Sequence, residues 1–201
     1  MKKSTLIALA VTTALSTSQS FAADTSNYFG VSYGQTTVDT GVTAGSAILD
    51  DEDTGFKIFA GHNLNDSMAI EVHYADLGEA TLSGNSGDTF SISGTAYAFT
   101  VNNAKVAVAA TSIGAAGVYK FTTNSSVVPF AKLGLHRWEI DATVSGGSSF
   151  ASATDDGVDI FFGFGADVAV NEKISIRAEY ESYDVDGDDV DNISIGLVAN
   201  F

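Results

Sequence analysis

The sequence has no cysteine, a single proline, few basic residues and no long apolar run. Without cysteine the chain can form no disulfide, no thiolate metal site, no cysteine nucleophile and no lipidated N-terminal cysteine. No segment of the sequence reaches the run of about 18 apolar residues that a transmembrane helix needs. Only 9 Lys and Arg residues stand against 25 Asp and Glu residues, which argues against binding to nucleic acid.

The chain is nonetheless rich in apolar residues, which make up 45% of its 201 positions. This length suits one domain with a sizeable core. An acidic chain is disordered only when it is also poor in apolar residues, and this one is not. Charge and apolar surface must therefore lie on different parts of a folded structure.

The first 22 residues have the three parts of a secretory signal peptide. Lys2 and Lys3 form the positive start, residues 6–15 are mostly apolar, and Ser20 and Ala22 suit cleavage before Ala23. We expect residues 1–22 to be removed and residues 23–201 to form one exported domain. The exported part then keeps 25 acids and 9 minus 2, or 7, bases, a formal charge of −18.

Apolar residues recur at every second position of the exported part, which is the period of a β-strand with one apolar face. The closing segment shows it clearly, because Ile193, Ile195, Leu197, Ala199 and Phe201 alternate with residues that are mostly polar or small. Eight such segments occur, near residues 29–34, 56–61, 68–74, 112–121, 131–136, 158–170, 174–181 and 192–201. The parity falters at Arg137 and Trp138, which predicts a bulge or a strand end there.

The connections between these segments alternate in length. Three are short, at residues 64–67, 122–126 and 171–173, and four are long, at 38–53, 78–104, 141–156 and 184–191. An even strand number with short turns on one side is typical of bacterial outer-membrane barrels. The sequence thus predicts an all-β fold, an eight-stranded antiparallel up-and-down transmembrane β-barrel. Alternation around Phe90 and Tyr97 also predicts a hairpin that extends beyond the membrane.

One face of the strands is almost free of charge, and the other carries charges and many glycines. A dry protein core would hold those charges at high cost, whereas a narrow eight-stranded lumen can pair them, with glycines making room for the long side chains. The predicted lumen charge network comprises Lys57, Glu71, His73, Lys120, Lys132, His136, Arg177, Glu179 and Glu181. Two lipid-facing aromatic belts are expected, with Phe29, Tyr119, Phe121 and Phe201 near the short turns and Phe56, Tyr74, Trp138 and Tyr180 near the long loops. The alternative is a soluble sandwich or lipocalin-like barrel with these aromatic residues in its core.

Residues 55–61, 71–78, 131–139 and 177–180, followed by a last strand that ends in Phe201, resemble the OmpA-like family of small outer membrane β-barrels. The resemblance implies an integral protein of the Gram-negative outer membrane, with short turns in the periplasm and contacts to lipid and lipopolysaccharide. It also implies insertion by the barrel assembly machinery, which reads the terminal aromatic residue, here Phe201. A monomer is expected. Because the chain stops at Phe201, the peptidoglycan-binding domain of many members is not expected.

Catalysis and metal binding have weak support in the sequence. A hydrolase needs a nucleophile beside a base, and none of His62, His73 and His136 has a serine two residues away on the same strand face, so no enzyme and no cofactor is expected. Carboxylates cluster at residues 50–53 and 184–191. Weak candidate ligands for Ca²⁺ are Asp184, Asp186, Asp188 and Asp189, although solvated loop charge also explains them.

Three functions remain open at this point. The leading hypothesis is a structural or surface-interaction role through long acidic extracellular loops, with an unidentified extracellular ligand. The alternative is a narrow gated pore through the charged lumen, which requires the charge network to open. A lipid-modifying outer membrane enzyme is a third, less favoured hypothesis.

Overall fold

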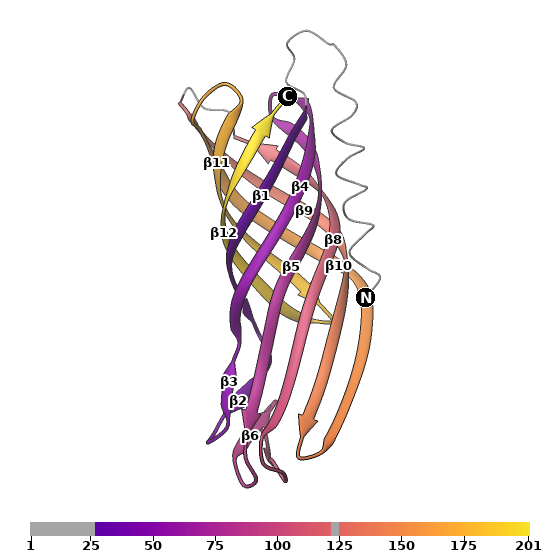
Figure 1. Ribbon diagram of the computed structural model, residues 1–201. Helices are drawn as coiled ribbons and strands as arrows, with labels where there is room; N and C mark the ends of the chain where they lie inside the picture. The colour runs from indigo at the N-terminus through magenta and orange to yellow at the C-terminus, as the bar shows by residue number, and fades with distance from the viewer. Residues whose placement is uncertain (1–26, 122–124) are drawn as a thin grey trace.

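A computed structural model describes residues 27–121 and 125–201, which are drawn in colour in Figure 1. The expected signal peptide lies outside the described residues. Those residues form twelve β-strands, and they contain no helix that is long and apolar enough to cross a membrane.

Eight of the strands close into one antiparallel barrel, which confirms the predicted fold class. The barrel strands are β1 (Asn27–Val38), β4 (Glu52–Asn65), β5 (Met68–Gly84), β8 (Ala104–Lys120), β9 (Val127–Gly146), β10 (Ser149–Ala169), β11 (Ile174–Val185) and β12 (Asp188–Asn200). Each pairs with the strands before and after it in this order, and β1 pairs with β12 to close the ring. At the closing seam, Tyr33 lies opposite Ile195.

Four short strands lie at the end of the barrel opposite Asn27 and the C-terminus, which we call the distal end (Figure 1). They are β2 (Val42–Ala44), β3 (Ile48–Asp50), β6 (Thr89–Ile92) and β7 (Thr95–Ala98). β2, β6 and β7 form a small separate sheet, and β3 adds to the distal part of β5. The expected hairpin within residues 78–104 is confirmed as β6 and β7.

Two of the expected long loops are wrong, because strands occupy most of residues 141–156 and 184–191. β9 and β10 contain 20 and 21 residues and turn near Gly147. β11 and β12 turn at Asp186 and Gly187, whose φ angles of 57° and 89° suit a type I′ hairpin turn. Beyond the membrane both faces of a strand can meet water, so the alternation that marks a strand in lipid fades there.

The barrel wall is much taller on one side than on the other. β10 pairs with β9 along its whole length, from Ser149 to Val168, but its pairing with β11 spans only Phe161 to Ala169. β5, β8, β9 and β10 therefore project distally beyond β11, β12 and β1, as Figure 1 shows.

Large apolar side chains cover the outside of the barrel on all eight barrel strands. Leu133, Leu135 and Ile193 are 63%, 60% and 66% exposed, although they belong to regular strands. A soluble protein rarely exposes a continuous apolar surface of this kind, whereas a lipid bilayer favours it. The outward residues include Val31, Ile70, Ile113, Leu133, Ile160, Ile176, Ile195 and Leu197.

One residue of the expected aromatic belts points the other way. Trp138 is only 4% exposed, and its Nε1 donates a hydrogen bond to Asp159 Oδ2 at 2.7 Å. β9 runs through this point without a bulge, so the predicted irregularity at Arg137 and Trp138 is wrong. Arg137 takes an outward place because the strand has left the apolar band, and Trp138 keeps the inward parity of Lys132.

Candidate functional site

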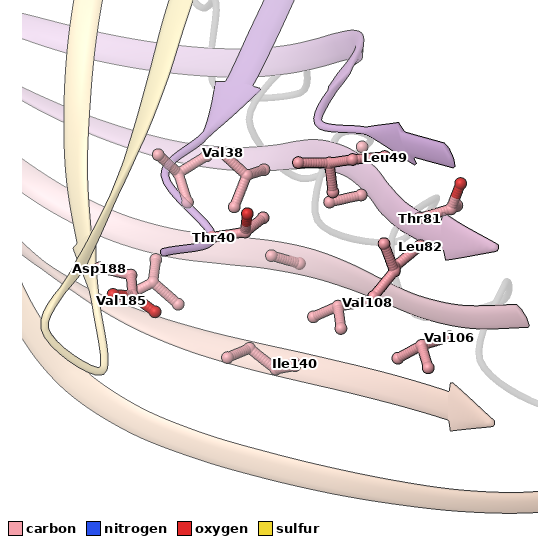
Figure 2. A pocket seen from close by; sticks show the side chains of 14 residues that line it. Val38, Thr40, Leu49, Thr81, Leu82, Val106, Val108, Ile140, Val185 and Asp188 are labelled. Carbon is pink, nitrogen blue, oxygen red and sulfur yellow. The ribbon is translucent and has the colours of Figure 1, made fainter. Parts of the chain in front are cut away.

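The distal end of the barrel interior contains a partly enclosed cavity of about 190 Å³ (Figure 2). Its wall is mainly aliphatic and comes from six barrel strands and the segment before β4. Aliphatic lining residues include Val38, Leu49, Leu82, Val106, Val108, Ile140, Val185 and Val190. The polar side chains at the cavity are Thr40, Thr81 and Asp188.

A bulge in β5 shapes this part of the interior. The register between β5 and β8 shifts between Asp76 and Glu79, and Gly78 there has a φ of 78°, which a glycine adopts without strain. The bulge changes the parity of β5, so that Leu77 before it and Leu82 after it both point inward.

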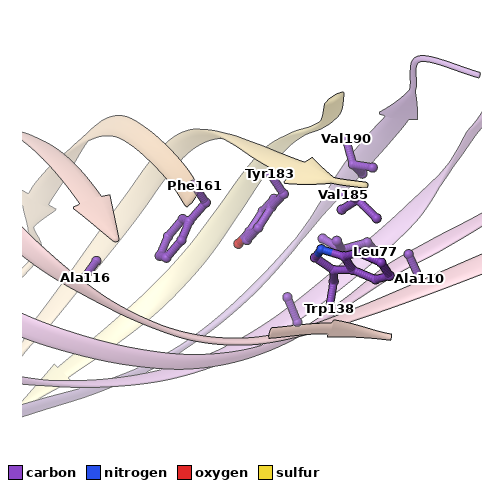
Figure 3. Close-up of a cluster of buried hydrophobic side chains, with 9 residues drawn as sticks. Leu77, Ala110, Ala116, Trp138, Phe161, Tyr183, Val185 and Val190 are labelled. Carbon is purple, nitrogen blue, oxygen red and sulfur yellow. The ribbon is translucent and has the colours of Figure 1, made fainter. Parts of the chain in front are cut away.

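A layer of nine buried apolar side chains forms the floor of the cavity (Figure 3). Phe161 and Tyr183 stack at its centre, with ring centroids 5.2 Å apart and planes 9° from parallel. Ala110, Val185 and Val190 belong both to this layer and to the cavity wall. The chain's single tryptophan, Trp138, lies in the same layer.

Two of the predicted lumen residues, His73 and His136, meet through a serine. Ser112 Oγ lies 3.1 Å from His73 Nε2 and 3.0 Å from His136 Nδ1, and His136 Nε2 lies 2.9 Å from the Asp184 carbonyl oxygen. Ser112 belongs to β8, between the two histidine strands. The sequence criterion covers only serines on the strand of each histidine, so it does not find Ser112, which contacts both histidines from the strand between them.

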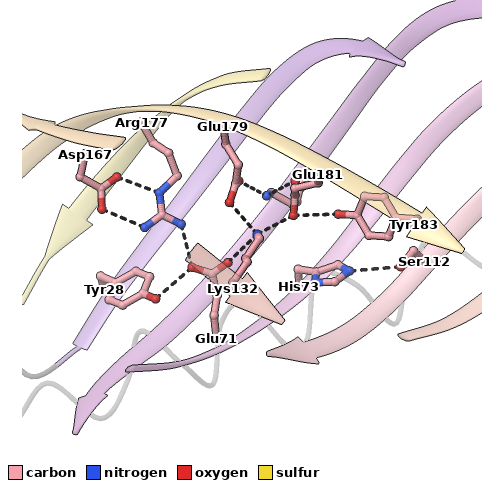
Figure 4. Close-up of polar contacts among 11 residues, drawn as sticks. Tyr28, Glu71, His73, Ser112, Lys132, Asp167, Arg177, Glu179, Glu181 and Tyr183 are labelled. Carbon is pink, nitrogen blue, oxygen red and sulfur yellow. Dashed lines mark hydrogen bonds and ion pairs between the residues drawn. The ribbon is translucent and has the colours of Figure 1, made fainter. Parts of the chain in front are cut away.

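Arg177 forms one half of the charge network below this layer (Figure 4). Its Nε and Nη2 donate to the two carboxylate oxygens of Asp167 at 2.8 and 2.9 Å, and its Nη1 donates to Glu71 Oε2 at 2.7 Å. The guanidinium carbon also lies 4.7 Å from the centroid of the Phe59 ring and 4.4 Å from that of Phe130. Bidentate pairing and ring contacts together fix the guanidinium in one geometry.

Two lysines form the other half of the network. Lys132 Nζ lies 3.2, 2.7 and 2.5 Å from carboxylate oxygens of Glu71, Glu179 and Glu181, and Lys57 pairs with both Glu179 and Glu181. The side chains of these five residues are at most 4% exposed. Charges buried to this degree are tolerated only when several partners satisfy each of them.

Three further members of the network were missed in the sequence. Tyr28 donates its hydroxyl to Glu71 Oε2 at 2.9 Å, and Tyr183 donates to Glu181 Oε1 at 3.0 Å. Asp167, the carboxylate partner of Arg177, shares the strand parity of the lumen-facing glycines Gly163 and Gly165, and that parity could have identified it.

Lys120 lies apart from the other predicted lumen residues. It is half-buried, its Nζ donates to Asn63 Oδ1 at 2.7 Å, and the same nitrogen lies 4.8 Å from the centroid of the Tyr28 ring. With Lys120 included, the ion-pair network and its immediate surroundings contain four bases and four acids among the described residues. The bases are Lys57, Lys120, Lys132 and Arg177, and the acids are Glu71, Asp167, Glu179 and Glu181.

Glycines make room in the lumen chiefly for aromatic rings. Five inward rings each lie directly opposite a glycine on a neighbouring strand. These pairs are Tyr28–Gly61, Phe59–Gly30, Phe130–Gly165, Trp138–Gly157 and Phe161–Gly134. A Cβ atom on Gly61 would lie 2.0 Å from Cζ of Tyr28, so a larger residue cannot replace this glycine without moving the ring.

An eight-stranded barrel with an apolar exterior and a paired charge network inside has the organisation of an outer membrane protein. The sequence matches the family model described as outer membrane protein beta-barrel domain over residues 7–201. The chain belongs to this family. It is therefore an integral protein of the Gram-negative outer membrane, as the sequence predicted.

Solved structures of other outer membrane barrels have the same fold. OprG of Pseudomonas aeruginosa aligns with a TM-score of 0.56 and 16% identity over 88% of this chain and 96% of its own. Ail, the attachment invasion locus protein of Yersinia pestis, aligns with a TM-score of 0.53 and 16% identity over 88% of this chain and 99% of its own. The N-terminal barrel domain of P. aeruginosa OprF aligns with a TM-score of 0.53 and 13% identity over 88% of this chain and 98% of its own. At these identities the likeness concerns the fold alone. No curated protein matches the sequence significantly.

Outer membrane barrels place their short turns in the periplasm and their longer connections outside the cell, so the distal end of this family member is extracellular. The candidate calcium ligands lie there, on the β11–β12 hairpin. Asp184 Oδ1 accepts a hydrogen bond from the Gly187 nitrogen at 3.0 Å. In residues 27–121 and 125–201, no group of three or more acidic, histidine or cysteine side chains is placed to hold a metal ion.

Asp188 differs from the other carboxylates of the hairpin because it lines the distal cavity. Burial raises the pKa of its carboxyl above the ordinary value of 3.8, and the negative charges of Asp39, Asp186, Asp189 and Asp184 raise this pKa further. The site therefore concentrates negative charge at the edge of an apolar surface.

The terminal aromatic residue lies at the closing seam of this outer membrane barrel. The Phe201 nitrogen donates to the Asn27 carbonyl at 3.0 Å, and its own carbonyl accepts from the Asn27 nitrogen at 3.2 Å. Its ring is half exposed on the periplasmic rim.

Proposed function

We propose that this outer membrane barrel has a structural or surface-interaction role, exerted by its extracellular strands and connections around a closed lumen. The observation that carries the proposal is the ion-pair network. Lys57, Lys132 and Arg177 meet four carboxylates within the narrow lumen, and the three basic side chains are at most 4% exposed. An eight-stranded lumen filled in this way leaves little room for continuous water.

The charge of the extracellular surface favours a cationic partner. Among the described residues, its two bases are Lys105 and Arg137, and each is already paired with a carboxylate, Glu79 at 3.2 Å and Asp156 at 2.9 Å. Ail was crystallised with the heparin analogue sucrose octasulfate. A polyanion of that kind is a poor match for the acidic surface of the present chain.

The proposal includes no catalytic step. Ser112 lies between two histidines, but it is 1% exposed, so a substrate could reach its hydroxyl only if the lumen opened. We further propose that Phe201 serves as the recognition signal for the barrel assembly machinery, and that lipid and lipopolysaccharide surround the apolar band.

A narrow gated pore is the second candidate, and two serines favour it. The hydroxyls of Ser32 on β1 and Ser194 on β12 are buried, and neither has a hydrogen-bond partner among the described residues. Both point into the lumen, where water could satisfy them. Opening the network beside this wall would create a path for ions.

Planar-bilayer recording of the refolded protein tests the closed lumen. We expect no steady conductance, because the network fills the lumen. Steady conductance that Ser194→Leu abolishes, with unchanged heat-modifiable migration on a denaturing gel, would replace our proposal with the pore.

Binding to protein-loaded lipid nanodiscs tests the surface role. Hexalysine should bind in a salt-sensitive manner, and sucrose octasulfate should not. Asp50→Asn, Asp51→Asn, Glu52→Gln and Asp53→Asn in combination should weaken hexalysine binding, whereas Asp66→Asn at a periplasmic turn should not. Equal binding to empty nanodiscs would contradict the proposal.

A further inference from the structure

We propose that the distal cavity binds a small amphiphile with an apolar body and one cationic group, such as an alkylamine or arylalkylamine. This inference rests on the proposed surface role in one respect, namely that the ligand arrives from outside the cell. It goes further by assigning a site and a ligand class.

The apolar part of the proposed site is unusual for the extracellular end of an acidic protein. Val106, Val108 and Ile140 on the tall wall lie across the cavity from Val185 on the short wall, as Figure 2 shows. Val190 on the short wall also lines the cavity. The layer that contains Trp138 forms the floor, so the cavity ends above the charge network instead of continuing into it. Apolar surface of this kind gains free energy when an apolar group displaces water from it.

The volume limits the occupant to a small group. An apolar cavity of about 150 Å³ can accept a benzene molecule. The distal cavity, at about 190 Å³, therefore fits one aromatic ring or a short alkyl chain but not the acyl chains of a whole lipid.

Charge at the rim selects the polar end of the ligand. Asp188 is the only charged residue among those that line the cavity, and four further carboxylates act on it, those of Asp39, Asp184, Asp186 and Asp189. A carboxylate or phosphate on the ligand would add to this repulsion, whereas an ammonium group would relieve it. Thr40, which lies near Asp188 in Figure 2, supplies a hydroxyl group that can accept a hydrogen bond from the ammonium.

Three six-carbon probes that differ only in charge test the inference: hexylamine, hexanol and hexanoate. Each is titrated at pH 7 into protein-loaded nanodiscs, with empty nanodiscs as the reference for partitioning into lipid. Trp138 reports by fluorescence, since it is the only tryptophan and packs in the apolar cluster that also contains the cavity residues Ala110, Val185 and Val190, and calorimetry gives the stoichiometry. We expect saturable binding of hexylamine with a dissociation constant about fivefold below that of hexanol, the upper range for a partly exposed ion pair, and no saturable binding of hexanoate.

Two matched pairs of variants localise the site. Val108→Phe fills the cavity and should abolish binding, whereas Val158→Phe, on the outward face of β10 and outside the cavity lining, should leave it unchanged. Asp188→Asn should remove the preference for hexylamine over hexanol, whereas Asp186→Asn, on the same hairpin but outside the cavity lining, should retain most of it.

Several results would overturn the inference: no saturable binding, equal affinity for hexanoate and hexylamine, or unchanged binding in a correctly folded Val108→Phe variant. The outcome is independent of the test of the closed lumen. A conducting barrel that still binds hexylamine contradicts the proposed function alone, and a closed barrel that binds none of the probes contradicts this inference alone.

Discussion

The two halves of the barrel interior have opposite chemistry. Within the membrane, the strands point apolar residues such as Leu135 outward and charged residues such as Lys132 inward. Beyond the membrane, the same strands point Arg137 outward and Trp138 inward. The outer half of the barrel is thus organised like a soluble protein, and the membrane half is inverted. The comparison shows that the solvent around a strand, and not the fold, decides which face of it becomes the core.

Removal of the Arg177 guanidinium from the membrane half should cause the largest loss of stability. Arg177→Met leaves Glu71 and Asp167 without their main partner in the lumen, which should cost about 3–5 kcal/mol of unfolding free energy. Urea unfolding in lipid vesicles, followed by Trp138 fluorescence, measures the loss.

Arg137→Met is the matched control for this substitution. Arg137 forms an ion pair with Asp156 on the exposed outer surface, so its loss should cost less than about 1 kcal/mol. Equal costs for the two arginines would mean that water enters the network freely and that the lumen is not closed.

Leu77→Ala tests the apolar core of the outer half. Leu77 is fully buried beside Trp138 and Tyr183, so truncation should leave a void and cost about 2–5 kcal/mol. Leu64→Ala, at an exposed site near a periplasmic turn, should change stability by no more than about 0.5 kcal/mol. A cost for Leu77→Ala as small as that of Leu64→Ala would show that the layer is loosely packed.

Gly61→Ala tests the fit between rings and glycines in the membrane half. The added methyl group would displace the Tyr28 ring and its hydrogen bond to Glu71, at a cost of about 1–3 kcal/mol. Gly117→Ala is the control, because nothing lies within 4 Å of its added Cβ atom. Thermal melting monitored by gel migration compares the two variants, and a silent Gly61→Ala would contradict the assigned ring position.

The smallest expected effect concerns the pH dependence of the β11–β12 hairpin. Burial and neighbouring carboxylates raise the pKa of Asp188, so the folded hairpin favours the protonated form. Its contribution to stability is present below the ordinary pKa of 3.8 and is lost as the pH rises through the higher folded pKa. Amide hydrogen exchange at residues 184–190, corrected for intrinsic rates, should show stronger protection at pH 4 than at pH 7. Asp188→Asn should reduce this difference, and a larger difference in the variant would contradict the prediction.

Within the membrane, the sequence predicts which face of each strand points to lipid, because lipid contact requires an apolar residue at every second position. Ile193, Ile195 and Leu197 alternate without error, and the same rule placed Glu71, Lys132 and Arg177 on the opposite face. Outside the apolar band the rule no longer holds, so the alternation predicts a loop at residues 141–156, where β9 and β10 continue, and places Trp138 in a lipid-facing belt.

Contacts across strands were the other part that the sequence could not reveal. The approach of Ser112 to His73 and His136 depends on the register of three strands, and so does each pairing of a ring with a glycine. The bulge at Gly78 reverses the parity of β5 and brings Leu82 into the cavity wall. It is absent from the predictions made on the sequence, because these assign residues 78–104 to a connection and not to a strand. Register describes how two strands are aligned with each other, and the pattern of residues within each strand does not predict that alignment.

The seam between β1 and β12 has a consequence for biogenesis. Tyr28 lies opposite Asn200, so the first and last strands of the barrel must pair before the ring is complete. Until then both strands would present unpaired amide and carbonyl groups to hydrocarbon, where each costs several kcal/mol. No shortened barrel made of the early strands alone can rest stably in the bilayer. All eight barrel strands must therefore be available before any of them commits to the membrane.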